Sequence, residues 1–386
     1  MHHWMPALLG SLLMTDLLLT ACAASPPAPA APAAPAAPAL PAASAAGGAS
    51  VSAPPAAAPT APAALTPVRM GTQTSVNDIA MWLGAERGYF KEEGIDLDLV
   101  PFSNASEMVP SLATDQLEAG GIAFNPAAIN AFARGVPLKI VLDRATFRPG
   151  FATQAMMVRK QVYDAGRGHT LGELKGLTVS VLPPGKGTGS ACALDAGMRM
   201  FGTTINDVEI TQLTAPDMLG AFVNGQVDAG LLQEPFLTDA LRQGSGVRIM
   251  GQDEMYPNFT LGVTAFSTKL YENRPVAKAV VKAYIRASRA YNDAVSGRTP
   301  PSDRAQIDAL LARYTKIDEA TVREMTPTGV SPNGLFNVES QLYCHKFFVD
   351  EGLVPQPLTD AQLAAIWGTE LVDEVLNEIG RVPEGA

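Results

Sequence analysis

Residues 107–120 read EMVPSLATDQLEAG, and residues 217–230 read DMLGAFVNGQVDAG. The two stretches align over fourteen positions without a gap, and the same Met, Gln, Ala and Gly recur in both. Each has the pattern of a helix, a tight turn and a buried strand that begins at Ala-Gly. Because one such unit occurs twice, we expect a structural repeat with one copy in each of two lobes.

Short apolar strands alternate with amphipathic helices around the first copy. We expect strands at 68–72, 95–100, 119–123 and 138–142, and helices at 79–87 and 107–115. Trp82 lies on the first of these helices and is expected in the core. Strands that alternate with helices favour an α/β fold with a mainly parallel sheet covered by helices.

The same alternation continues around the second copy and then gives way to helices. We expect strands at 177–182 and 208–210, a helix at 190–201, and a strand at 259–266 that leads out of the second lobe. Further helices are predicted at 275–294, 303–314, 338–349 and 360–379. This helical C-terminal part is expected to return and cover the first lobe.

Composition excludes some classes of partner. The chain has 28 Lys and Arg against 38 Asp and Glu, a net charge of −10, which argues against nucleic acid. Besides Cys22, the only cysteines are Cys192 and Cys344, too few for a disulfide framework. We expect them to be buried, unpaired thiols, and a bond between them in an oxidising compartment is the alternative. No histidine pair stands at metal-ligand spacing, so neither a metal nor a cofactor is expected.

The N-terminal region differs in composition from the rest of the chain. An apolar stretch ends at Leu19-Thr20-Ala21-Cys22, and residues 23–66 are nearly all Ala, Pro, Ser and Gly. The stretch resembles the lipobox of bacterial lipoproteins, which implies a signal peptide at 1–21, a lipid on Cys22 and a flexible linker over 22–66. Asp16 interrupts the apolar run, and the alternative is an ordinary signal peptide followed by an incidental cysteine.

Three stretches carry a resemblance to a known family: AERGYFKEEGIDL at 85–97, LGELKGLTV at 171–179, and GQVDAG at 225–230 followed by EPF at 234–236. They resemble solute-binding proteins of the nitrate/sulfonate/taurine and thiamine-precursor type, which serve ABC importers. The resemblance covers nearly all of residues 67–380. It implies a two-lobed periplasmic-binding-protein fold of type II, with two crossovers between the lobes.

On this fold, we expect residues 67–157 and 259–386 to form lobe one and residues 158–258 to form lobe two. Ligands of open α/β sheets bind beyond the carboxyl ends of the strands, so the loops of both lobes should face one cleft. The candidate ligand-binding residues are Gln73, Thr74, Asn77, Phe102, Asn104, Phe124, Asn125, Lys186, Gly187, Thr188, Ser190, Glu234, Tyr256 and Asn258.

The glycine-rich segment 185–190 is the most specific of these loops. Its glycines would let backbone N–H groups approach an anion at the start of the following helix. The alternative is a flexible loop in which Ser190 is the N-cap of that helix.

Aromatic residues and charges decide which ligand the sequence favours. Phe102, Phe124, Tyr256 and Phe259 fall close to the predicted loops, whereas positive charge comes only from Lys186, Arg144 and Arg148. This balance favours a heteroaromatic ligand, such as a thiamine-type pyrimidine or riboflavin. Alkanesulfonates, taurine and aromatic carboxylates remain alternatives.

The expected activity is therefore ligand capture and delivery to a permease by a monomer anchored on the extracytoplasmic side of the cell membrane. An enzyme resembling pyrimidine synthases is an alternative, but those enzymes use a cysteine cluster together with a histidine, and this chain lacks the cluster. A tethered sensor that presents its closed form to a receptor is a third possibility.

Overall fold

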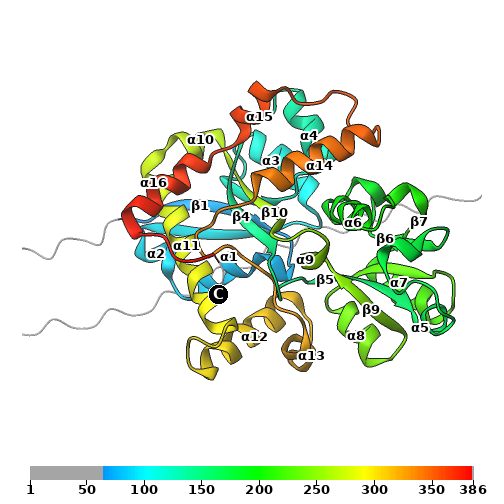
Figure 1. Ribbon diagram of the computed structural model, residues 1–386. Coiled ribbons are helices and arrows are strands. Elements are labelled where there is room, and N and C mark those ends of the chain that lie inside the picture. The colour runs from blue at the N-terminus through cyan, green and yellow to red at the C-terminus, as the bar shows by residue number, and fades with distance from the viewer. Residues whose placement is uncertain (1–63, 385–386) are drawn as a thin grey trace, which may run out of the picture. The chain divides into compact units, whose positions relative to one another are not determined.

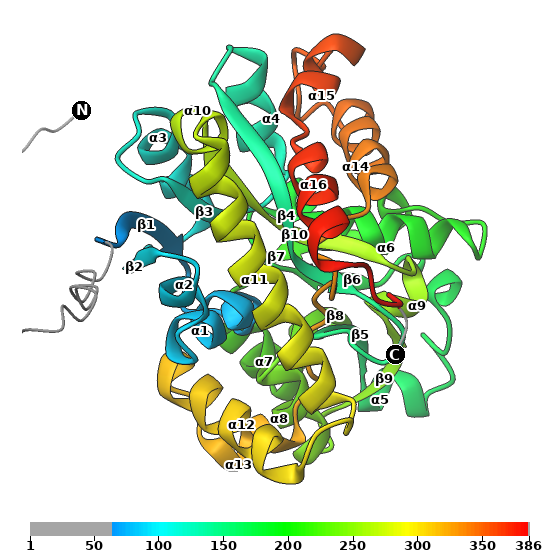
Figure 2. The ribbon, with the colours of Figure 1, turned by 90° about the vertical axis from the view of Figure 1, so that its left-hand side faces the viewer.

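A computed structural model describes residues 64–384 (Figures 1 and 2), which belong to one compact unit, Ala61–Ala386. The predicted signal peptide, Cys22 and all but the end of the predicted linker lie outside the described residues. None of the helices between 64 and 384 is long and apolar enough to cross a membrane.

Two five-stranded sheets form the two lobes, with the orders β2-β1-β3-β10-β4 and β7-β6-β8-β5-β9. The first sheet contains β1 Thr66–Thr72, β2 Ile95–Pro101, β3 Ala119–Ile122, β4 Leu138–Phe147 and β10 Phe259–Ser267. The second contains β5 Gln154–Arg159, β6 Thr178–Val181, β7 Glu209–Gln212, β8 Ala229–Gln233 and β9 Gly246–Gly251.

Helices cover both sheets. Around the first sheet and the first crossover lie α1 Ile79–Glu86, α2 Tyr89–Glu92, α3 Met108–Ala113 and α4 Pro126–Ala133. Lobe two adds α5 Lys160–Asp164, α6 Gly189–Arg199, α7 Ala215–Val223, α8 Phe236–Arg242 and α9 Gln252–Met255. The C-terminal part comprises α10 Thr268–Glu272, α11 Arg274–Val295, α12 Pro301–Thr315, α13 Glu319–Glu324, α14 Val338–Asp350, α15 Asp360–Ile366 and α16 Thr369–Ile379.

The predicted repeat is confirmed, because its two copies take equivalent places in the two sheets. The first copy forms α3 and β3, and the second forms α7 and β8. A Cβ on Gly120 would lie 3.2 Å from Met108 Sδ, and one on Gly230 would lie 2.9 Å from Met218 Sδ. The shared glycine thus leaves room on the strand for the shared methionine of the preceding helix, which packs down on the sheet.

The matched acids of the repeat also have matched roles. Glu118 Oε2 accepts a hydrogen bond of 2.8 Å from the Arg69 N–H on β1, and Asp228 Oδ2 accepts one of 3.1 Å from the Thr178 N–H on β6. Each carboxylate therefore satisfies a backbone donor on the neighbouring parallel strand, one residue before that strand begins to pair with β3 or β8.

Each sheet is mainly parallel, as expected, and contains one antiparallel strand that arrives from the other lobe. β10 runs antiparallel to β3 and β4, and β5 runs antiparallel to β8 and β9. The chain therefore crosses between the lobes twice, after β4 and after α9, and the two-lobed type II fold is confirmed. The proposed division between 157 and 158 lies inside β5, which pairs along its length with lobe two.

The helical C-terminal part packs mainly on lobe one, where α11 crosses α1 and α16 lies against α11. Figure 2 shows the long α11 running across the face of the first sheet. Trp82 is fully buried and stacks on Tyr314 with ring centroids 4.7 Å apart, so its predicted place in the core is confirmed.

The prediction of one continuous helix over 360–379 was wrong. The helix breaks between α15 and α16, where Trp367 forms a β-bridge with Ile140 and the Gly368 N–H donates to the Ile140 carbonyl at 2.8 Å. A Cβ on Gly368 would lie 2.8 Å from the Tyr271 ring, so the chain passes this point only as glycine. Residues 367–368 thus pair with the edge strand β4, although their local sequence favours a helix.

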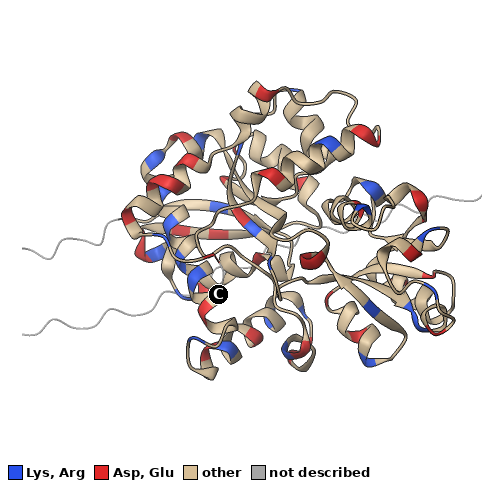
Figure 3. Ribbon diagram, viewed as in Figure 1, with Lys and Arg blue, Asp and Glu red and all other residues tan. Residues whose placement is uncertain are grey.

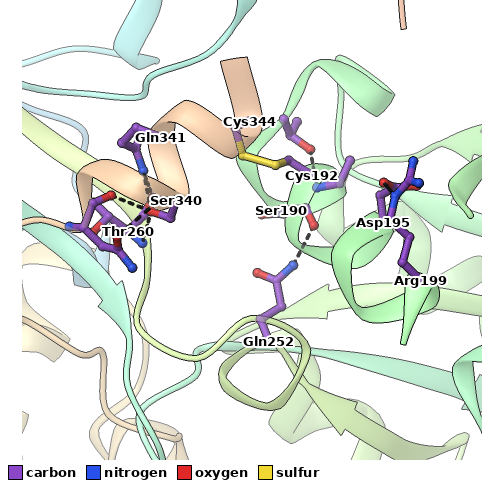
Figure 4. Close-up of a disulfide and its surroundings, with 12 residues drawn as sticks. Ser190, Cys192, Asp195, Arg199, Gln252, Thr260, Ser340, Gln341 and Cys344 are labelled. Atoms are coloured by element: carbon purple, nitrogen blue, oxygen red, sulfur yellow. Dashed lines mark hydrogen bonds and ion pairs between the residues drawn. A yellow bond between two sulfur atoms is a disulfide. The ribbon is translucent and has the colours of Figure 1, made fainter. Parts of the chain in front are cut away.

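The prediction of unpaired thiols was also wrong. Cys192 on α6 and Cys344 on α14 form a disulfide, with Cα atoms 5.7 Å apart and a separation of 152 positions in the sequence (Figure 4). The two cysteines meet because α14 packs against α6, a contact between helices remote in the chain.

Candidate ligand-binding cleft

A cavity of about 340 Å³ lies between the lobes, at the carboxyl ends of β1 and β8 and the start of β5. It is lined by Thr74, Ser75, Val76, Asn77, Thr153, Gln154, Gln233, Glu234, Pro235, Phe236, Thr315 and Ile317. The structure thus brings together three of the predicted site residues, Thr74, Asn77 and Glu234. Their position beyond strand carboxyl ends is the one that open α/β sheets use for ligands.

A buried ion pair fixes the loop of lobe one that lines this cavity. Asp78 is fully buried, and its Oδ1 lies 2.5 Å from Arg144 Nε. Its Oδ2 accepts hydrogen bonds from Thr72 Oγ1 at 2.7 Å and from the Gln73 N–H at 2.8 Å. One carboxylate therefore joins β4 to the end of β1 and holds the chain where it turns into residues 74–77.

Glu234 joins the lobe-two side of the cavity to lobe one. Its Oε2 accepts hydrogen bonds from the Thr238 N–H at 3.1 Å and from Thr238 Oγ1 at 2.7 Å, and its Oε1 accepts one of 3.0 Å from the Thr326 N–H. Thr326 follows α13 in lobe one. Burial raises the pKa of Glu234, although these hydrogen bonds oppose the shift. Glu234 is also the only charged residue among those that line the cavity.

Gln154 gives the cavity an unused polar group. It is the first residue of β5, its side chain is 5% exposed, and its Oε1 accepts no hydrogen bond from any residue between 64 and 384. Buried side-chain amides in folded proteins are nearly always hydrogen-bonded. An orphaned amide oxygen beside a cavity therefore points to a ligand or an ordered water as its partner, which the oxygen would meet after a small rotation of the side chain, because it has almost no exposed surface in this structure.

The predicted glycine-rich loop lies at another part of the lobe interface. A Cβ on Gly187 would lie 3.7 Å from Pro126 of α4, so the loop packs against lobe one. Lys186 Nζ forms an ion pair with Glu351 at 2.7 Å. Thr188 is the N-cap of α6, because its Oγ1 accepts from the Ala191 N–H at 3.1 Å, whereas Ser190 is buried within the helix. The N-cap expected at Ser190 is therefore two residues earlier.

Four more candidates lie outside the cavity. Asn104 and Asn125 use their side chains as N-caps, of a 3₁₀ turn before α3 and of α4 respectively. Phe124 is 3% exposed and packs 5.4 Å from the Trp367 ring, while Phe102 is half-buried beside the core. Tyr256 and Asn258, which directly precede β10, also lie outside the cavity. Tyr256 packs edge-on against Phe259, and Asn258 is exposed.

The aromatic residues and cations from which a heteroaromatic ligand was predicted therefore do not line the cavity. Phe236 is the only aromatic side chain among the lining residues. Arg144 is paired with Asp78, and Arg148 donates to Asn292 Oδ1 and, at 2.8 Å, to the Glu384 carbonyl. Figure 3 shows cationic and acidic residues interspersed over the ribbon.

Several lining residues were not predicted from the sequence, and the sequence features that could have identified them differ. Thr153 and Gln154 start the first crossover strand, so the topology of two crossovers could have identified them. Phe236 directly follows the quoted Glu-Pro pair at the end of β8. Thr315 and Ile317 come from the end of α12, and no local pattern places that helix end beside the cleft.

Comparison with known proteins gives a consistent picture. A family model described as the NMT1-like family matches residues 61–299. An aliphatic sulfonates-binding protein of Bacillus subtilis (strain 168) is 27% identical over 210 residues, which are 53% of this chain and 59% of that relative. The chain thus matches less than two thirds of the relative's length.

Solved structures share the fold. The periplasmic aliphatic sulphonate binding protein from Escherichia coli superposes with a TM-score of 0.62 at 23% identity, covering 78% of this chain and 92% of that one. A desulfurization enzyme superposes with a TM-score of 0.53 at 14% identity, covering 81% of this chain and 99% of that one. The fold therefore occurs in both binding proteins and an enzyme, and the site must distinguish them.

Proposed function

The chain belongs to the NMT1-like family, and from this premise we propose that it is the solute-binding component of an ABC importer. In this proposal a small polar ligand enters the cleft between the lobes, the lobes close over it, and the closed form docks on a permease. The proposed place of action is the extracytoplasmic side of the cell membrane, with Cys22 as the lipid attachment site.

One observation carries the proposal. Both lobes contribute to a cavity that holds Gln154, a buried side-chain amide whose oxygen has no partner in residues 64–384. At about 340 Å³ the cavity is at the small end of the range of roughly 300 to 1,000 Å³ that ligand pockets span. A small solute that donates a hydrogen bond to Gln154 would complete the site.

The lining chemistry favours an amine-bearing ligand, and a short aminoalkane sulfonate of the taurine type fits it best. Hydroxyl and amide groups of Ser75, Asn77 and Gln233 offer donors to sulfonate oxygens. Glu234 is the only charge in the lining, so a bare anion would meet a buried acid without a compensating cation. An ammonium group on the ligand would instead pair with that acid.

A heteroaromatic aminopyrimidine is the second candidate, supported by the ring of Phe236. That one ring could stack on the ligand while Glu234 accepts from its amino group. The other aromatic residues named for this purpose pack in the core or against one another, which is why the aliphatic ligand comes first.

Binding is favoured over catalysis by the same lining. The twelve residues around the cavity include no Cys, His or Lys, and Glu234, their only acid, already accepts hydrogen bonds from Thr238 and Thr326. The hydroxyl of Thr74 donates to the neighbouring Gln73 carbonyl and not to a base. We therefore propose no chemical step at this site.

Isothermal titration of the full chain with taurine, ethanesulfonate and an aminopyrimidine tests the proposal. Taurine should bind at least tenfold more tightly than ethanesulfonate, a difference of about 1.4 kcal/mol. Glu234→Gln should reduce that preference, and Gln154→Ala should weaken all ligands. Equal binding of taurine and ethanesulfonate would refute the ligand class. Absence of both binding and compaction in small-angle scattering, across a broad solute panel, would refute the function.

A further inference from the structure

Helix α14 is attached to lobe one through its first turns. The Asn337 N–H donates to Thr260 Oγ1 at 2.9 Å, the Thr260 N–H donates to Ser340 Oγ at 3.2 Å, and Gln341 Nε2 donates to the Thr260 carbonyl at 2.7 Å. Ser340 and Gln341 are buried. Thr260 is the second residue of β10, so these bonds fix the start of α14 to the first sheet (Figure 4).

The middle of α14 and the residue that follows the helix are attached to lobe two. Cys344 is joined to Cys192 of α6 by the disulfide, and both side chains are buried. Glu351, directly after the helix, accepts from Lys186 Nζ at 2.7 Å and from Asn206 Nδ2 at 2.7 Å. One helix thus has its start hydrogen-bonded to one lobe and its middle covalently bound to the other.

The opposite edge of the cleft lacks such a connection among residues 64–384. Near the ligand cavity, lobe two meets lobe one through the Glu234–Thr326 hydrogen bond and through an ion pair between Arg242 and Glu324 at 2.9 Å. Both side chains of the ion pair are about half exposed, at 46% and 58%. Contacts of this kind break and re-form readily in water.

We propose that α14 is a covalent strap that holds the lobes together along the α4/α6 edge, so that the cleft opens only at the α8/α13 edge. The two crossovers, after β4 and after α9, already connect the lobes, and the disulfide adds a third covalent connection. The disulfide limits how far the lobes can separate at the α4/α6 edge, whereas no covalent bond among residues 64–384 holds the α8/α13 edge. The edge lined by Glu234 and Thr326 is then the entrance for the ligand.

The strap should hold the lobes together only while the disulfide is oxidised. Cleaving the disulfide with a phosphine and water gives two cysteine thiols and the phosphine oxide. Only non-covalent contacts then hold this part of α14 to lobe two, namely its packing on α6 and the Lys186–Asn206–Glu351 contacts, so the α4/α6 edge should then separate as well.

Two spin-label pairs on the ligand-free full chain, introduced as unnatural amino acids so that the cysteines stay intact, test the strap. Labels at Arg134 and Met200 report on the α4/α6 edge, and labels at Arg323 and Gln243 report on the α8/α13 edge. All four positions are exposed. In the oxidised protein, the first pair should give one narrow distance distribution and the second a broad one.

The variant with Cys192→Ser and Cys344→Ser should broaden the first distribution and shift it to longer distances. Glu351→Gln, which keeps the disulfide, is the matched control and should leave it narrow. Phosphine treatment of the wild-type chain, with circular dichroism to verify the fold, gives the same test if the double variant does not fold. A first distribution that is already broad when oxidised, or that is unchanged after loss of the disulfide, would overturn the proposal. Neither outcome depends on the identity of the ligand.

Discussion

Replacing Asp78 by Ala should destabilise the protein and weaken ligand binding together. The carboxylate is fully buried, pairs with Arg144 at 2.5 Å and accepts from Thr72 and Gln73. Its removal leaves the Arg144 guanidinium, 6% exposed, as a buried cation without its partner. Breaking a buried pair in this way typically costs about 3 to 5 kcal/mol.

The expected shift in melting temperature follows from the size of the folded part. An unfolding entropy of about 2.1 cal/mol/K per residue, over about 320 residues, gives roughly 0.7 kcal/mol/K. A loss of about 3 to 5 kcal/mol then lowers the melting temperature by about 4 to 7 °C. Because Asp78 also fixes residues 74–77, affinity for the cleft ligand should fall in the same variant.

Calorimetry and urea titration of Asp78→Ala measure the loss, and the double variant with Asp78→Leu and Arg144→Met is the control. Removing both charges should restore part of the stability, because no unpaired cation remains, although Thr72 and Gln73 still lack an acceptor. A loss below about 1 kcal/mol in Asp78→Ala, or a double variant less stable than the single one, would refute the reasoning.

Two further predictions concern other parts of the fold. Gly230→Ala should destabilise more than Gly120→Ala in urea titration, because its Cβ would lie 2.8 Å from the Phe222 ring, whereas the Cβ on Gly120 would lie 3.2 Å from Met108 Sδ; equal losses would contradict this. Burial raises the pKa of Asp143 from 3.8, its value in the unfolded chain, to about 7. The free energy of unfolding should therefore fall as the pH rises between these two pKa values. Asp143→Asn should remove that slope in the urea midpoint, and an unchanged slope would show that another group causes it.

The sequence predicts the architecture well because its strongest signals are local and repeated. The matched residues of 107–120 and 217–230 each report a contact within one helix-turn-strand unit, such as Met218 against Gly230. The disulfide and the break at Trp367–Gly368 escape such reasoning, because each depends on a segment far away in the chain, α6 in one case and β4 in the other.

The site was harder to predict than the fold for a chemical reason. Polar residues in loops before helices can bind a ligand or cap the helix, and both uses favour the same residue types. Asn125 and Thr188 serve as caps, while Asn77 lines the cavity. Likewise, the buried cations Arg144 and Arg148 are used within lobe one, and the sequence alone does not distinguish a cation that holds a loop from one that holds a ligand.

Titration calorimetry of the full chain and of Gln154→Ala with taurine tests the central claim most directly. The account predicts saturable binding of one ligand per chain that Gln154→Ala weakens at least tenfold while its melting temperature without ligand stays close to that of the unaltered protein, since Gln154 Oε1 has no partner to lose within residues 64–384. Binding that is unchanged in Gln154→Ala would place the ligand outside this cavity and contradict the account.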